Sequence, residues 1–176
     1  MMKTGKINVA ELDLVEKVVN INRVQKVHKG GRHLRWNALV VVGDKRGVVG
    51  VGMGKAKEVP DAIRKGLDAA RKALFRVSLN GPSVPHDAVG EFGAARVILR
   101  SAAPGTGVIA GASVRAVMEC VGIHDVLAKS LGSVNPINTV KATMAALAQM
   151  RTPAQVLEMR GKLPYRRKEP TGAAAD

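Results

Sequence analysis

A row of alternating glycines followed by a lysine is the feature of this sequence that most strongly suggests chemistry. Residues 50–55 read Gly-Val-Gly-Met-Gly-Lys, so they could begin a phosphate-binding loop. A P-loop needs a glycine, four further residues, and then Gly-Lys followed by Ser or Thr. Here Val49 stands where the first glycine belongs and Ala56 where the hydroxyl belongs, and a dinucleotide-binding fingerprint would need glycine in place of Lys55. We therefore interpret the glycines as the place where a helix packs closely on a strand.

A second glycine-rich segment precedes an expected helix. Gly105-Thr106-Gly107 is followed by Gly111, and the N–H groups of a helix N-terminus could hold an anion. That anion could be an RNA phosphate or the phosphate of a small molecule, and a simple turn is the commonest use of such a segment. A kinase would also need carboxylates for Mg²⁺. The carboxylates in this half of the chain are scattered, with no spacing that ties them together: Asp87, Glu91, Glu119 and Asp125.

Metal and nucleophile chemistry find little support. The histidines lack zinc-ligand spacing, and a single cysteine cannot complete a zinc finger. No Ser/His/Asp combination lies in a nucleophile elbow. We therefore expect a protein that is not an enzyme and that uses no cofactor and no metal, with Cys120 as a small buried hydrophobe. The histidines are His28, His33, His86 and His124.

The net charge points to a polyanionic partner instead. The 176 residues contain 28 Lys and Arg against 14 Asp and Glu, which gives a formal net charge of +14 and a pI of about 10.5. Phe, Trp and Tyr make up 2% of the chain, which argues against base stacking on aromatic side chains and for cationic groups on a nucleic-acid backbone. The basic residues gather in three segments, 26–35, 55–76 and 160–168.

The N-terminal residues and the hydropathy of the chain predict its cellular location. No apolar block follows the first residues, so we expect no signal peptide. No window reaches the apolar length of a membrane helix, so we expect no membrane partner and a soluble cytosolic protein.

The first half of the chain predicts an antiparallel sheet with one helix. Apolar residues alternate in the strands, and Val59, Ile63 and Leu67 recur at helical spacing around Pro60. We expect the basic connection at 24–32 to project as a mobile loop, because it ends in two glycines. It could be a solvated hairpin tip, but the charge of the whole chain favours a tip that contacts RNA. The expected order is a strand at 14–28 with a bulge near Asn22, a strand at 32–42, a hairpin loop at 43–47, a strand at 48–54, a helix at 58–74 and a short strand at 76–79.

The turn-forming residues at 80–85, rich in Gly and Pro, predict a domain boundary. The second half of the chain then mixes strands and helices. We expect strands at 86–89 and 95–100 joined by a turn at 90–93, followed by a flexible corner at 101–107 and a helix at 110–121 capped by Gly122. A strand at 123–129 and a loop at 130–136 should come next. The last expected elements are a helix from Asn138 or Thr139 to Met150, with Val140, Met144, Leu147 and Ala148 buried, and a short helix ending at Met159.

At this point the motifs resemble a known family. Residues 30–44 and 47–60, and in the second half 105–111, 115–117, 127–130 and 135–138, are similar to the bacterial small-subunit ribosomal protein S5 family. The resemblance runs from about Val18 to Met159. Trp36 departs from it conservatively, because the family usually carries Phe or Tyr there.

The resemblance implies an α+β fold in two domains. The first would resemble a double-stranded-RNA-binding domain, and the second would be rich in β-α-β units with a left-handed crossover, against the usual right-handed preference. The expected division is a flexible lead-in at 1–12, the first domain at 13–80, the second at 85–159 and a basic flexible tail at 160–176.

The resemblance also implies a structural role in the small ribosomal subunit, in the cytoplasm. It implies contacts with small-subunit ribosomal RNA, with proteins four and eight of that subunit, and with messenger RNA near its entry channel, and thereby support of assembly, decoding accuracy and messenger unwinding. The loop with Lys26 would lie near the family's spectinomycin site. Gly105, Thr106, Gly107 and Arg115 would lie toward protein four, where changes alter accuracy. From charge and resemblance together we predict RNA contacts at Arg23, Lys26, Lys29, Gly30, Gly31, Arg32, Arg35, Lys45, Arg46, Lys55, Lys57 and Arg64.

Two other functions are weighed against this one. A small-molecule phosphotransferase is suggested by the strand, glycine corner and helix of the second half, and it would bind ATP·Mg²⁺ tightly and with little dependence on salt. A general double-stranded-RNA chaperone would bind RNA with steep salt dependence but without preference for ribosomal RNA.

Overall fold

The computed structural model describes residues 12–162. The expected lead-in, apart from Leu12, and the tail beyond Lys162 lie outside the described residues. Within the described range, two four-stranded sheets and four helices make a mixed α+β fold, which confirms the expected class. Among residues 12–162, no helix has the length and apolar character needed to cross a lipid bilayer.

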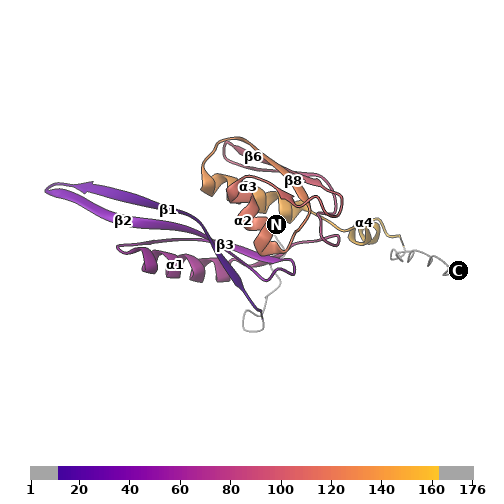
Figure 1. Cartoon of the computed structure of the whole chain (residues 1–176), viewed down its shortest axis with the longest axis horizontal. Coiled ribbons are helices and arrows are strands. Elements are labelled where there is room, and N and C mark those ends of the chain that lie inside the picture. Colours follow the sequence, from indigo (N-terminus) through magenta and orange to yellow (C-terminus); the bar gives the residue numbers. More distant parts are fainter. Residues whose placement is uncertain (1–11, 163–176) are drawn as a thin grey trace.

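The first sheet is antiparallel throughout, with strand order β1-β2-β3-β4. Helix α1 packs along β2 and β3. Figure 1 shows β1 and β2 as a long hairpin that projects well beyond the rest of the molecule. The elements are β1 (Val15–His28), β2 (Gly31–Gly43), β3 (Val48–Ala56), α1 (Val59–Lys72) and β4 (Phe75–Arg76).

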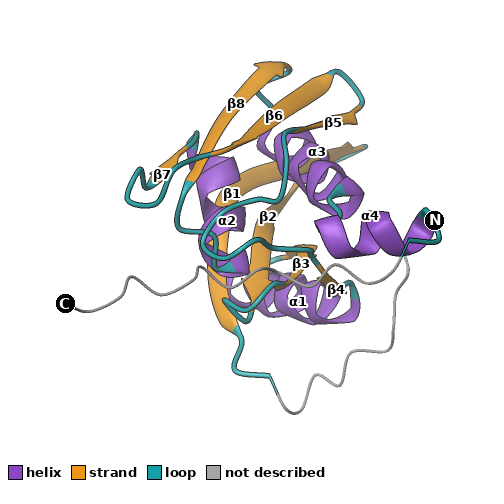
Figure 2. Cartoon of the chain, turned by 90° about the vertical axis from the view of Figure 1, so that its right-hand side faces the viewer, coloured by secondary structure: helices purple, strands orange, loops and turns teal. Residues whose placement is uncertain are grey.

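The second sheet has strand order β5-β6-β8-β7, and β7 pairs with β8 in parallel. Helix α3 packs on β5 and β6, and helix α2 packs on α3 and on the first sheet. Figure 2 shows the result as layers, with α2 and α3 between the two sheets and α1 on the outer side of the first. The elements are β5 (Ala88–Phe92), β6 (Ala95–Ser101), β7 (Val108–Ile109), α2 (Ala112–Val121), β8 (Val126–Gly132), α3 (Pro136–Gln149) and α4 (Pro153–Met159).

The glycine row of β3 lies directly against α1. A methyl group added at Gly50, Gly52 or Gly54 would overlap a carbonyl oxygen of the helix backbone. Gly66 is the matching small residue of the helix, because a Cβ there would lie 3.3 Å from the amide nitrogen of Gly54. The predicted close packing of helix on strand is therefore confirmed. It brings the two backbones nearer than any side chain would allow.

The other face of the same sheet belongs to a core shared with the second half of the chain. Leu39, Val41 and Val49 join one continuous cluster of buried residues with α2, α3 and the second sheet. Cys120 of α2 is buried in this cluster, as predicted, with its Sγ 4.0 Å from the carbonyl oxygen of Val41. Burial raises the pKa of the Cys120 thiol to about 11. The base of the first sheet is thus covered on both faces.

The hydrophobic core covers only part of the β1–β2 hairpin. Residues 38–43 of β2 are buried, Trp36 and Asn37 are half-buried, and residues 31–35 are exposed. The strand pairing nevertheless continues to the pair His28 and Gly31, which a two-residue turn connects. We call residues 20–36 the distal hairpin. The distal hairpin is therefore held by the hydrogen bonds between its two strands rather than by a hydrophobic core.

Two predictions for this hairpin are corrected. The bulge lies between Val18 and Asn20, not near Asn22, and the register is regular from Asn20 to the tip. The segment 24–32, expected as a mobile connection, is paired strand apart from Lys29 and Gly30. Gly30 has φ 101, a left-handed conformation that glycine adopts without strain, and this lets the turn close after only two residues.

The expected turn at 90–93 is also wrong. Strand β5 continues through Phe92, and the turn consists of Gly93 and Ala94. Gly90 is a strand residue, and a Cβ there would overlap the carbonyl oxygen of Ala142 in α3. This glycine therefore serves close approach of a helix, as in β3, rather than a change of chain direction.

Other boundaries shift by a few residues. The short strand expected at 76–79 is β4 at Phe75–Arg76, and the strand expected at 123–129 is β8 at Val126–Gly132, so its end occupies part of the expected loop at 130–136. Helix α3 begins at Pro136, because the Asn135 side chain caps it by accepting from the Ile137 amide at 3.1 Å. Ala148 is exposed rather than buried. The left-handed C-cap at Gly122, with φ 91, is confirmed.

We predict that Gly52→Ala destabilises the protein by about 3 kcal/mol, because the new methyl group would force α1 away from β3. Urea unfolding of the full chain measures the effect. Gly111→Ala is the matched control, since a Cβ there meets no atom within 4 Å, and its cost should stay within about 1 kcal/mol. Equal losses for the two variants would contradict close packing at β3.

Candidate nucleic-acid interface

The distal hairpin has an uncovered face built by cross-strand pairing. Residues directly opposite each other in an antiparallel pair share a face. The register places Asn37 of β2 between Asn22 of β1 and Lys55 of β3. Because Leu39 and Val41 continue this face into the core, the residues farther out extend it beyond the covered base. We call its polar residues the open face: Asn22, Lys26, His28, His33, Arg35, Asn37 and Lys55.

The opposite face of the distal hairpin is also basic. Arg23 and Arg32 lie there, and they line a shallow hollow with Val24, Gln25 and Leu34. Trp36 is opposite Arg23 and packs against the cluster under α1. Cations therefore extend from both sides of the same pair of strands.

Beyond Glu16, the hairpin carries no acidic residue to balance these cations. From Lys17 to Gly43 the sequence contains neither Asp nor Glu. The four ion pairs found in residues 12–162 include Lys17 with Glu119 and Arg71 with Glu16, both at the base of the hairpin. The other two, Arg96 with Glu91 and Arg100 with Asp87, lie in the second half. The basic residues in this acid-free segment are Lys17, Arg23, Lys26, Lys29, Arg32 and Arg35.

Asn37 is a feature of the open face that sequence reasoning missed. Its Oδ1 is buried and has no hydrogen-bond partner in the described part of the chain. An unsatisfied buried acceptor costs about 1–3 kcal/mol. The register places Asn37 between Asn22 and Lys55, and only the register could have indicated this position from the sequence.

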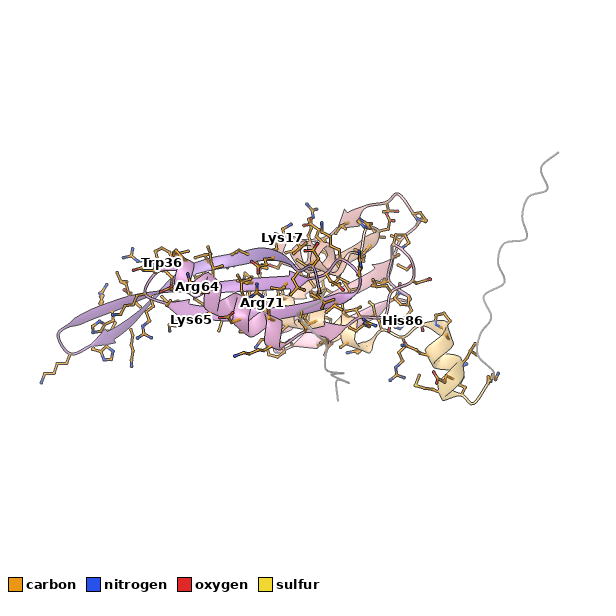
Figure 3. The ribbon with its side chains drawn as sticks, turned by 90° about the horizontal axis from the view of Figure 1, so that it is seen from below. Lys17, Trp36, Arg64, Lys65, Arg71 and His86 are labelled. Atoms are coloured by element: carbon orange, nitrogen blue, oxygen red, sulfur yellow. The ribbon has the colours of Figure 1, made fainter. Side chains whose placement is uncertain are left out.

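Helix α1 carries a second basic strip. Figure 3 shows Arg64, Lys65 and Arg71 along the helix, with Trp36 near the place where the hairpin leaves it. Arg71 donates to Glu16 at 2.8 Å, whereas Arg64 and Lys65 are exposed and belong to none of the ion pairs above. Lys57, just before the helix, is exposed as well. Arg64 and Lys57 are predicted RNA contacts, and Lys65 adds to them.

The structure does not bring Lys45 and Arg46 to the hairpin tip. Both lie in the loop between β2 and β3, at the opposite end of β2. The Lys45 amide donates to the Cys120 carbonyl oxygen at 3.0 Å, which places this loop against the end of α2. Any RNA contact of these two residues would therefore be separate from the contacts of the tip residues 26–31.

In the glycine corner before α2, residues 101–107, the amides of Thr106 and Gly107 both have hydrogen-bond acceptors. The Gly107 amide donates to Asp125 Oδ1 at 2.9 Å, and the Thr106 amide and hydroxyl both donate to the Ala103 carbonyl oxygen. Gly105 and Gly107 have φ of 88 and 79. Since the buried side chain of Asp125 already accepts from the amide, the corner favours a structural turn over an anion site.

Arg115 lies exposed on α2, in the turn that follows the corner. Its backbone amide donates to the Gly111 carbonyl oxygen at 2.8 Å, so the residue is fixed in the first turn of the helix. Its guanidinium belongs to none of the four ion pairs within residues 12–162 and is available to a neighbour.

The described residues offer no evident metal centre. Across 12–162, no three of the His, Cys, Asp and Glu side chains cluster in a way that could ligate an ion. The arrangement is that of a binding surface, with cations on a projecting ladder and on one helix.

Most of the described residues match known protein families. The family model for "Ribosomal protein S5, N-terminal domain" matches residues 14–78, and that for "Ribosomal protein S5, C-terminal domain" matches residues 90–160. The small ribosomal subunit protein uS5 of Nocardia farcinica is 58% identical over 165 residues, which cover 94% of this chain and 75% of the relative.

We predict that Asp125→Ala destabilises the protein by about 2 kcal/mol, because it leaves the Gly107 amide without its charged acceptor. Chemical denaturation measures this, with limited proteolysis at the corner as a local readout. Asp125→Asn keeps an acceptor and should lose less. Asp87→Ala is the control: its exposed carboxylate accepts from the Ser101 amide at 3.2 Å, and its loss should be small. A similar loss in Asp87→Ala and Asp125→Ala would count against a role of Asp125 in holding the corner.

Proposed function

This chain belongs to the ribosomal protein S5 family, a structural and non-enzymatic family of the small ribosomal subunit, and on that premise we propose that it binds small-subunit ribosomal RNA through the β1–β2 hairpin. Its place is in the ribosome, in the cytoplasm. The observation that carries the proposal is the acid-free segment from Lys17 to Gly43, which forms a strand ladder that is regular from Asn20 to the tip.

The mechanism is phosphate neutralisation by cations held in fixed positions. Each phosphate contact releases condensed counterions, so affinity should fall steeply as salt increases. Because cations extend from both faces of the hairpin, two RNA segments could bind on opposite sides of one ladder. The hairpin would then fix the position of one segment relative to the other. Arg64, Lys65 and Lys57 would extend the contact along α1.

We propose two finer features of the fold. The first half resembles a double-stranded-RNA-binding domain, supported by an antiparallel sheet with α1 on one face. In the second half, the parallel strands β7 and β8 flank α2 in the chain, and the family resemblance supports a left-handed crossover there. The division into domains at 13–80 and 85–159 remains a proposal. The core shared by the two halves supports their acting as one rigid unit.

We further propose that the second half contacts neighbouring proteins four and eight of the subunit and supports assembly, decoding accuracy and messenger entry. Gly105, Thr106, Gly107 and Arg115 would lie at the contact with protein four. Support comes from the exposed Arg115 guanidinium and from Gly105, where an added Cβ meets no atom within 4 Å. An interface of limited stability there would let its rupture favour the closed, decoding state.

We predict that Lys26→Gln and Arg35→Gln each weaken binding to small-subunit ribosomal RNA and lower the slope of log K against log salt by about 1 per lost phosphate contact. Filter binding with the full chain measures both quantities. Arg96→Gln is the matched control, because Arg96 lies in the second sheet and pairs with Glu91 at 2.6 Å.

A salt slope unchanged in both hairpin variants, or lowered equally in Arg96→Gln, would refute the hairpin as the RNA contact. Binding of unrelated duplex RNA as tight as that of ribosomal RNA would instead indicate a general RNA chaperone.

A further inference from the structure

Two imidazole rings meet at the tip of the β1–β2 hairpin. The ring centroids of His28 and His33 lie 5.2 Å apart, with an interplanar angle of 68°. The two residues stand on different strands, one before and one after the turn. The low aromatic content of the chain counts only Phe, Trp and Tyr, so it does not include these two histidine rings.

The register places both rings on the open face. His33 is opposite Lys26, and His28 is opposite Gly31, so the rings are diagonal neighbours across the ladder. Gly31 carries no side chain to cover His28, and a Cβ added at Gly30 or Gly31 would meet no atom within 4 Å. Both histidines are exposed. The space beside the ring pair is therefore open.

The edge-to-face contact gives the pair a useful geometry. One ring directs its edge at the face of the other, so the opposite face of that second ring stays free. Each ring also limits the rotation of its neighbour, which reduces the ordering that a ligand would require. A flat, exposed ring face between cations is the environment in which proteins bind unpaired RNA bases, by stacking on the ring and contacting the flanking phosphates.

We propose that the His28–His33 pair is a stacking site for an unpaired RNA base. The cations that would hold the phosphates on either side are Lys26, opposite His33, and Lys29, in the turn. This inference rests on the proposed RNA-binding function and goes beyond it, since phosphate contacts alone would not select single-stranded RNA.

Two RNA probes and two double variants of the full chain test the proposal. One probe is a fragment of small-subunit ribosomal RNA with an unpaired internal loop that carries 2-aminopurine, whose fluorescence reports stacking. The other is a fully paired duplex with the same number of phosphates. The variants are His28→Ala with His33→Ala, which removes the rings, and His28→Phe with His33→Phe, which keeps flat rings without the imidazole nitrogens. His124→Ala, an exposed histidine of the second half, is the control.

We expect the alanine variant to bind the loop RNA about tenfold more weakly, the order of magnitude of one lost stacking contact, and to lose the 2-aminopurine response. Its affinity for the duplex should not change. The phenylalanine variant should retain loop binding, and His124→Ala should behave as the unmodified protein does.

Three outcomes overturn the proposal. They are an alanine variant that binds the loop RNA normally, one that loses loop and duplex binding equally, and a phenylalanine variant as weak as the alanine variant. If the unmodified protein binds neither RNA, the proposed function fails first. If it binds both and the alanine variant is normal, only the stacking site fails. Circular dichroism confirms that each variant folds.

Discussion

The backbone contact between β3 and α1 is the constraint on which the rest of this structure depends. Gly50, Gly52 and Gly54 let the helix lie so close that a single methyl group would displace it. With α1 seated on one face, the other face of the sheet is left for Leu39 and Val41 to join the core around α2. The base of the sheet is therefore fixed from both sides. This anchorage allows the hairpin to extend beyond the core without a core of its own.

The free part of the hairpin combines a stiff ladder with an uncompensated charge. Edge strands usually carry charges that discourage pairing with other chains, and β1 has Glu16, Lys17, Arg23 and Lys26. In this hairpin the charges beyond Glu16 all have one sign, so they repel one another in the free protein. The RNA phosphates that we propose as the partner would relieve that repulsion. The same charges would thereby oppose aggregation of the exposed strand and favour a polyanionic partner.

Local signals are readable from the sequence, and contacts distant along the chain are not. The glycine row of β3, Pro60 in α1 and the cap at Gly122 are predictable because each depends on nearby residues. Gly90 looks like a turn residue until α3, some fifty residues later, is seen to lie against it. At the candidate site, charge predicts the basic residues, but Asn37 and the His28–His33 pair depend on register. The opposite placement of Lys45 and Arg46 from the tip follows from the expected strand at 32–42, but sequence alone does not show that their loop lies against the end of α2.

Amide hydrogen exchange of the full chain, alone and with small-subunit ribosomal RNA, tests the central claim most directly. We predict that RNA slows exchange in the distal hairpin, at residues 20–36, and leaves α3 unchanged. Protection confined to the second sheet or α3, with the hairpin exchanging as in the free protein, would contradict the claim.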